Sequence, residues 1–244
     1  MTDEFLKPGT TYLPHGFSDF ALSRFGAGDP EPVVAELSKD TGYERVGIDR
    51  AMAIAVDLAV RGQRQGATIL DVGCSVGTIG ILLSEVGYRV TGIDSDVVAS
   101  VQEWQDESAI ARARGAGGGG GEKFDFVRAD LRDFMASNAK EYDVVLLLSV
   151  LHHWLSGYGY CGVAKFDRQE MRETLLTLCS RVRDCIYLEV PIDDEAVEMP
   201  PDPEGEFVFP RWFLESQQAK DVSLIASTVA TNGKPRRLYR VEMA

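Results

Sequence analysis

The sequence predicts an α/β protein: a three-layer αβα sandwich with a mostly parallel seven-stranded sheet that ends in an antiparallel hairpin. Short apolar runs alternate with amphipathic helical stretches from residue 49 to residue 190, as crossover connections between parallel strands require. The early runs are apolar without alternation, which is typical of strands covered by helices on both faces. Two final β-rich stretches, 222–229 and 238–242, flank a turn that contains Asn-Gly, which predicts the hairpin.

The first strand–turn–helix–strand unit lies between Ala67 and Asp94. Its first strand, 68–72, is a β-branched apolar run too short for a helix. Apolar residues then recur at the spacing of one helix face: Ile79, Leu82, Leu83 and Val86. Gly87 stands where a left-handed helix stop belongs, and a second strand, 89–93, leads directly to Asp94.

The turn inside this unit has the composition of a ligand site. It runs from Gly73 to Gly77 and contains only small side chains, so backbone N–H groups at the helix start can approach a ligand closely. Asp94 follows Gly73 by 21 residues (94 − 73), near the roughly 20 expected of a carboxylate that binds a ribose diol. The unit therefore predicts a site for an adenosine-type cofactor.

The glycine spacing separates two cofactor classes. Gly73, Gly77 and Gly80 give G-x-x-x-G-x-x-G, which lacks the middle glycine of the nicotinamide and flavin fingerprint. Asp71 would repel a pyrophosphate but suits the ammonium and sulfonium groups of S-adenosylmethionine (SAM). Here the chain resembles the class I SAM-dependent methyltransferases, whose first motif is (D/E)-x-G-x-G-x-G, with Ser75 in place of the central glycine.

The resemblance implies a Rossmann-like form of the sandwich, SAM as cofactor and S-adenosylhomocysteine (SAH) as product. It implies an N-terminal extension or lid over residues 1–48 and a methyltransferase domain over 49–244. Within that domain, residues 191–209 carry seven acidic side chains and no Lys or Arg. We expect this acidic insertion to be a loop near the substrate face.

The other elements follow in alternation. A helix at 49–61 precedes the first strand, a helix capped by Asp96 runs to about residue 114, and the glycine tract 115–121 reads as a surface loop. Alternating or continuous apolar patterns then predict strands at 123–128, 142–149 and 185–190, and helices at 131–138, 168–182 and 210–220.

The resemblance also assigns roles to single residues. Asp130, at the end of the third strand, would face the adenine amino group; from local sequence alone it is equally an N-cap for the next helix, and both roles are compatible. The full set of expected cofactor contacts is Asp71, Gly73, Cys74, Ser75, Gly77, Asp94, Ser95, Asp130, Leu131 and Ser149.

A histidine pair follows the most apolar strand. His152 and His153 follow 142–149 after two residues, Val150 and Leu151, at the sheet edge where open α/β folds bind ligands. Methyl transfer to a hydroxyl needs a nearby nucleophile and removal of its proton, which an imidazole performs near neutral pH. We expect one of the two to be the general base, and the sequence does not distinguish them. The N/D-P-P-Y/F motif of amine methylation is absent, since Ser149 begins S-V-L-H there.

The composition limits the classes of substrate and partner that the protein can bind. The chain has 25 Lys and Arg against 38 Asp and Glu, a net charge of −13, which disfavours nucleic acid as a partner. We expect no membrane span, a cytoplasmic location with reduced cysteines, and no metal site. The predicted function is SAM-dependent methylation of a small molecule, preferably at oxygen. The alternatives are a catalytically degenerate SAM-binding partner domain and, less favoured, an NAD(P)-dependent oxidoreductase.

Overall fold

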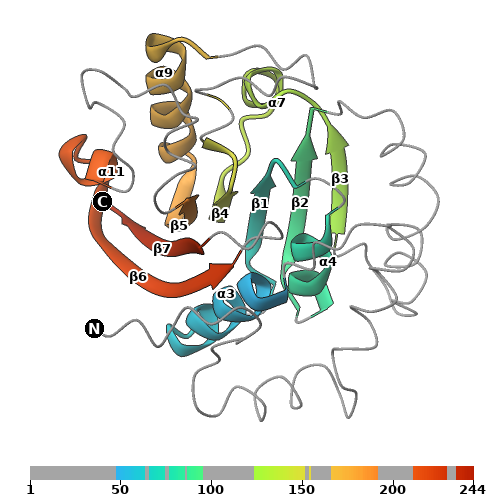
Figure 1. Ribbon diagram of the computed structural model, residues 1–244. Coiled ribbons are helices and arrows are strands. Elements are labelled where there is room, and N and C mark those ends of the chain that lie inside the picture. The colour runs from blue at the N-terminus through green and yellow to red at the C-terminus, as the bar shows by residue number, and fades with distance from the viewer. Residues whose placement is uncertain are drawn as a thin grey trace, which may run out of the picture.

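A computed structural model of the chain provides the architecture (Figure 1). The residues that it describes are 48–63, 66–74, 77–85, 87–95, 124–151, 154, 166–191, 211–229 and 235–244. The predicted helix from Asp96, the glycine tract and almost all of the N-terminal extension and the acidic insertion lie outside these ranges.

Seven strands form one sheet in the order β3-β2-β1-β4-β5-β7-β6. Their bounds are β1 Thr68–Val72, β2 Arg89–Asp94, β3 Phe124–Arg128, β4 Tyr142–Leu148, β5 Val182–Pro191, β6 Ala219–Val229 and β7 Pro235–Met243. The first five strands are parallel, whereas β7 is antiparallel to both β5 and β6. The predicted fold class and the C-terminal hairpin are therefore confirmed.

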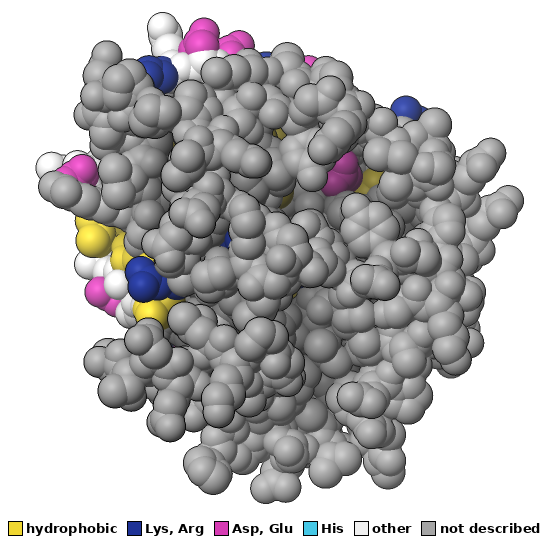
Figure 2. Space-filling view, viewed as in Figure 1, with side chains coloured by type: hydrophobic (Ala, Val, Ile, Leu, Met, Phe, Trp, Pro, Cys, Tyr) yellow, Lys and Arg dark blue, Asp and Glu magenta, His cyan; other side chains and the backbone are white. Residues whose placement is uncertain are grey.

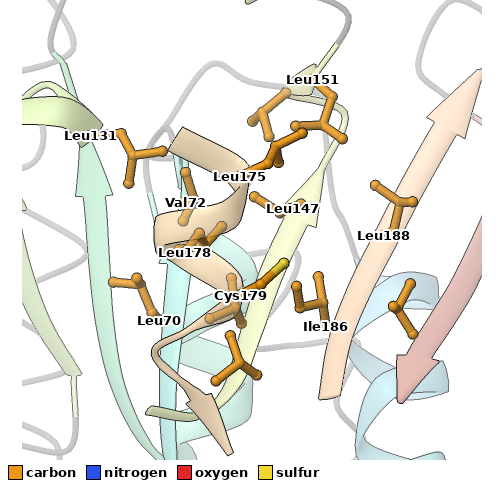
Figure 3. Close-up of a cluster of buried hydrophobic side chains, with 14 of the residues drawn as sticks. Leu70, Val72, Leu131, Leu147, Leu151, Leu175, Leu178, Cys179, Ile186 and Leu188 are labelled. Carbon is orange, nitrogen blue, oxygen red and sulfur yellow. The ribbon is translucent and has the colours of Figure 1, made fainter. Parts of the chain in front are cut away.

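Helices cover both faces of the sheet. Their bounds are α3 Ile48–Val60, α4 Thr78–Glu85, α7 Leu131–Ser137, α9 Arg168–Cys179 and α11 Arg211–Glu215. One buried cluster joins the sheet to α3 and α4, and the other joins it to α7, α9 and α11. Adjacent strand residues serve opposite clusters: Ile69 belongs to the first and Leu70 to the second, because successive strand side chains point to opposite faces. Figure 3 shows the second cluster between α9 and the sheet.

Most predicted elements are confirmed, with corrected boundaries at β5, at α11 and in the hairpin. Val182 begins β5 instead of ending a helix, so β5 starts three residues earlier than expected. The helix expected over 210–220 is only Arg211–Glu215, and Lys220 belongs to β6. Both hairpin strands are longer than predicted, and Pro235 lies in β7.

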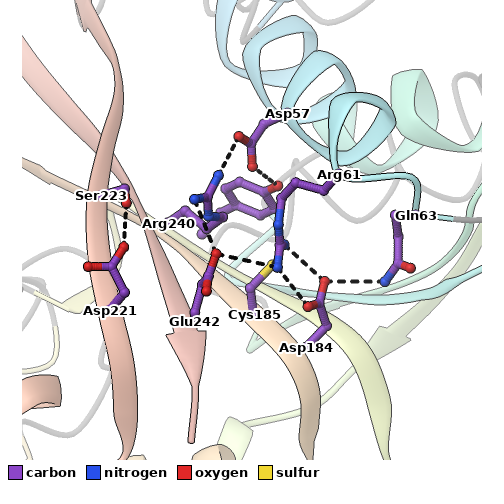
Figure 4. A network of polar contacts seen from close by, with 10 residues as sticks. Asp57, Arg61, Gln63, Asp184, Cys185, Asp221, Ser223, Arg240 and Glu242 are labelled. Carbon is purple, nitrogen blue, oxygen red and sulfur yellow. Dashed lines mark hydrogen bonds and ion pairs between the residues drawn. The ribbon is translucent and has the colours of Figure 1, made fainter.

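Polar contacts fix the C-terminal half of α3 to the sheet (Figure 4). The Asp57 carboxylate accepts hydrogen bonds from Tyr187 Oη and Arg240 Nη1, each at 2.6 Å. Arg61 donates to both oxygens of Asp184 at 2.8 and 3.0 Å. The helix is thereby tied to β5 and β7, which fixes where its N-terminal turn lies.

The surface near β6 carries side chains of several kinds. Figure 2 shows hydrophobic, basic and acidic side chains side by side at the edge where Figure 1 draws β6, and Leu224 of that strand is 52% exposed. None of the helices in the described ranges combines the length and apolar character needed to cross a membrane.

Candidate cofactor site

The carboxyl ends of the parallel strands meet at one edge of the sheet. Val72 of β1 is in register with Ile93 of β2 and Leu147 of β4, and Leu148 is in register with Glu189 of β5. The last residues of these four strands therefore lie next to one another. This edge is where open α/β sheets bind their ligands.

The β1–α4 turn depends on glycine at both ends. Gly73 and Gly77 have φ values of +67° and +79°, a backbone conformation that L side chains avoid. A Cβ at Gly73 would lie 2.4 Å from Val150 Cγ1, so a side chain has no room there. The N–H groups of Gly73 and Cys74 both donate to Ile93 O, at 2.8 and 3.1 Å. Both N–H groups are therefore already bonded within the protein. What these two positions offer a ligand is close approach to the backbone.

A second glycine requirement comes from the ring of Phe124, the first residue of β3. An added Cβ would lie 2.7 Å from the ring at Gly77, 2.4 Å at Gly80 and 3.0 Å at Gly92. The ring therefore fills a notch that three glycines leave open. The sequence motif indicated a ligand role for the glycines, but it did not reveal this packing role.

Asp71 is enclosed beneath the turn. Only 3% of the residue is exposed, and burial, followed by the nearby Asp94 carboxylate, raises its pKa to about 7. The positive charge of Arg50 and a hydrogen bond from the Gly80 N–H oppose that rise. Two carboxylates thus influence each other across the ends of β1 and β2, and a cation bound there would favour their ionised forms.

The residue expected to bind ribose, Asp94, lies at the end of β2. Asp94 is its last residue, and both Asp94 and the following Ser95 are partly exposed. The Asp94 carbonyl accepts a hydrogen bond from Ala129 N at 3.0 Å. This contact places the end of β3, and hence Asp130, beside the end of β2.

Asp130 is the N-cap of α7, as the local reading predicted. Its Oδ1 accepts from Arg132 N and Nε at 2.8 and 2.9 Å, and its Oδ2 accepts from Arg132 Nη2 at 3.0 Å. These bonds lower the pKa of Asp130 despite its partial burial. Leu131 is buried in the core beneath α7, so a ligand would reach its backbone and not its side chain.

A buried polar group at the ends of β4 and β5 was not predicted. Glu189 is 1% exposed, pairs with Arg50 of α3 at 3.0 Å, and accepts a hydrogen bond from Ser149 Oγ. Ser149 has a φ of +58°, which costs a non-glycine residue about 1 kcal/mol and is found preferentially at functional sites. A single acidic residue inside the apolar strand 185–190 was the available sequence signal, because buried carboxylates are paired.

Three predicted site residues lie outside the described ranges: Ser75, His152 and His153. On either side of the histidine pair, Leu151 and Trp154 are buried in the core that contains α9. Among the residues that the structure describes, no group of His, Cys, Asp and Glu side chains is arranged to hold a metal ion.

Comparison with known proteins finds one family model that is similar to part of this chain. Residues 44–157 match the family model described as a methyltransferase domain, which spans β1 to β4 and the histidine pair. The match covers 114 (157 − 44 + 1) of the 244 residues, so this part of the chain is similar to a methyltransferase domain.

The relatives of this methyltransferase domain match only in part. The ubiquinone biosynthesis O-methyltransferase of Aromatoleum aromaticum is 32% identical over 88 residues, which are 36% of this chain and 33% of that protein. The chain therefore matches about a third of the length of this curated relative. The match supports the domain, whereas the activity of the whole chain is a separate question.

Solved structures extend the likeness to most of the fold. The bifunctional kinase-methyltransferase WbdD matches 88% of this chain and 42% of its own, with a TM-score of 0.60 and 22% identity. Magnesium protoporphyrin IX methyltransferase (ChlM) from Synechocystis PCC 6803, solved with bound SAH, matches 95% of each chain with a TM-score of 0.52 and 19% identity. At these identities the likeness concerns the fold.

Proposed function

We propose that the protein transfers the methyl group of SAM to a small-molecule acceptor, with oxygen as the favoured atom. The observation that carries the proposal is the pair of carboxylates, Asp71 and Asp94, flanking the glycine turn at the carboxyl ends of β1 and β2. Carboxylates at this position oppose a pyrophosphate and attract a cationic sulfonium nucleoside. The O-methyltransferase name of the partial relatives agrees with oxygen as acceptor.

Each residue has a defined task in this proposal. Asp71 and the Gly73–Gly77 backbone lie toward the methionine part of SAM, Asp94 binds the ribose hydroxyls, and Asp130 with the Leu131 backbone binds adenine. The acceptor oxygen attacks the methyl carbon as the carbon–sulfur bond breaks, which leaves SAH. His152 or His153 takes the proton of the acceptor hydroxyl.

Cofactor binding is tested with an Asp94→Asn variant. It should bind SAH about 10–150-fold more weakly than the wild type in titration calorimetry, because ribose hydroxyls lose a charged acceptor. Asp125→Asn, an exposed β3 position, should bind as the wild type does. A wild-type protein that binds NAD and not SAH would refute the proposed cofactor.

Chemistry is tested separately from binding. The protein is incubated with methyl-labelled SAM and a metabolite extract, and labelled products and SAH are identified by mass spectrometry. The double variant His152→Gln/His153→Gln should bind SAH normally and turn over the identified acceptor about 10²–10⁴-fold more slowly, as loss of a general base does. Unchanged turnover would remove both histidines from the mechanism, and SAH binding without any product would favour a degenerate partner domain.

A further inference from the structure

Arg132 holds the Asp130 carboxylate in a fork. Its Nε and Nη2 donate to the two carboxylate oxygens at 2.9 and 3.0 Å, and its backbone N–H donates to Oδ1 at 2.8 Å. A carboxylate offers about four acceptor directions. Among the described residues Arg132 takes three of them, so one direction remains, and it lies on Oδ2.

The guanidinium is itself fixed from two sides. Its carbon lies 4.6 Å from the centre of the Phe166 ring, close enough for a cation–π contact, and Nη1 lies 3.8 Å from Glu170 Oε1. Phe166 is stacked on Trp154 with ring centres 5.1 Å apart. Both rings are at least nine-tenths buried. Arg132 therefore cannot swing away from Asp130 without leaving this aromatic stack.

From this arrangement we infer that Arg132 is a positioning residue that determines nucleobase selectivity, because it presents Asp130 as a fixed acceptor for a purine 6-amino group. The inference rests on the proposed function, in which Asp130 binds adenine. An ionised carboxylate with one free acceptor direction accepts a hydrogen bond from an N–H group. It repels a 6-oxo group, because that group is also an acceptor. Hydrogen bonding from Arg132 lowers the pKa of Asp130, in keeping with an ionised carboxylate that only accepts.

The experiment compares SAH with S-inosylhomocysteine, in which a 6-oxo group replaces the 6-amino group. Titration calorimetry gives the ratio of the two dissociation constants. For the wild type we expect SAH to bind at least about tenfold more tightly, since the wrong partner leaves a charged acceptor unsatisfied. In Arg132→Gln the fork is lost and the Asp130 carboxylate can rotate, so the ratio should fall by about tenfold toward one.

Two further variants separate this role from a structural one. Arg132→Lys keeps the positive charge without the fork and should retain only part of the selectivity. Arg183→Gln is the matched control, since Arg183 also bridges two carboxylates, Glu141 and Asp143, at the opposite edge of the sheet. Its ratio should equal that of the wild type.

Each other outcome is decisive. If both affinities fall in parallel in Arg132→Gln and the ratio is preserved, Arg132 only supports the fold and the inference is wrong. It is also wrong if the wild type binds SAH but accepts S-inosylhomocysteine equally well, and in that case the proposed function stands. A wild type that binds neither compound overturns the proposed function and the inference together.

Discussion

At the scale of single residues, packing against the ring of Phe124 requires two of the three glycines of the motif, Gly77 and Gly80. Gly80 lies inside α4 with a helical backbone, yet its missing side chain leaves the space that the ring occupies. Glycine is required at position 80 because of Phe124, which is 44 positions away in the sequence (124 − 80). Local sequence shows the spacing of the motif but not the contact that requires it.

This packing gives a double-mutant prediction. Gly80→Ala should lower the free energy of unfolding by about 1–3 kcal/mol, because a Cβ 2.4 Å from Phe124 Cε2 overpacks the core. In a Phe124→Leu background the same change should have little effect or be stabilising, since alanine favours helix by about 1 kcal/mol over glycine. Urea unfolding of the four proteins measures the coupling.

Gly62 is the natural control for that cycle. It has a φ of +74°, but a Cβ there would meet nothing within 4 Å. Gly62→Ala should therefore cost only about 1 kcal/mol of backbone strain, and the cost should be the same with Phe124 or Leu at position 124. Equal costs of Gly80→Ala in both backgrounds would show that the ring does not require the glycine.

At the scale of elements, α3 is held by ion pairs of graded burial. The side chains of Arg240 and Asp57 are 17% and 16% exposed, and those of Arg61 and Asp184 are 21% and 31% exposed. The Arg183–Glu141 pair on the strands is more than half exposed, at 55% and 54%. The energetic value of an ion pair depends strongly on this exposure.

The grading predicts an order of destabilisation. Asp57→Ala should cost about 3 kcal/mol, because it leaves Tyr187 and Arg240 without their shared carboxylate in a poorly hydrated place. Asp184→Ala should cost about 1 kcal/mol and Glu141→Ala less than about 0.5 kcal/mol. Urea unfolding at constant pH measures all three, and a cost for Glu141→Ala as large as that for Asp57→Ala would contradict the order.

Element boundaries show where sequence reasoning stops. Val182 continues the apolar helix spacing from Cys179, yet it pairs with Tyr142 of β4, and that pairing is not encoded locally. The helix α11 is followed by Gln217 at φ +59°, whereas glycine or asparagine is the usual sign of such a stop. Elements with strong periodicity, such as β1 and α4, were predicted to within a residue or two.

At the scale of the whole molecule, the strand sequence predicted the sheet, but not the contacts across its edge. The ends of β1 and β2 are close in sequence, so Asp71 and Asp94 could be assigned to one site. Arg50 and Glu189 are 139 residues apart, and only the folded sheet brings them together. Their buried pair at the ligand edge is therefore invisible to spacing arguments.

The buried Asp71 carboxyl makes the stability of the whole fold depend on pH. Its pKa is about 7 in the folded protein against an ordinary value of 3.8, so between these values the folded state holds a proton that the unfolded chain has released. The free energy of unfolding should therefore fall as the pH rises from about 4 to about 7 through this group, by on the order of 4 kcal/mol. Burial raises the pKa of Asp71 most, Asp94 raises it further, and Arg50 and the Gly80 N–H lower it.

Asp71→Asn should remove that pH dependence, because asparagine keeps an acceptor for the Gly80 N–H and carries no charge. At pH 8 we expect the variant to unfold at a higher urea concentration than the wild type, and at pH 4 the two should be nearly equal. SAH should bind more weakly to the variant, since the ammonium group of SAH loses a nearby carboxylate. A variant that gains stability at pH 8 and loses cofactor affinity would show that the fold gives up stability to keep a negative charge at this edge. Equal stability of the two proteins at pH 8 would mean that Asp71 is already ionised and accommodated without the cofactor.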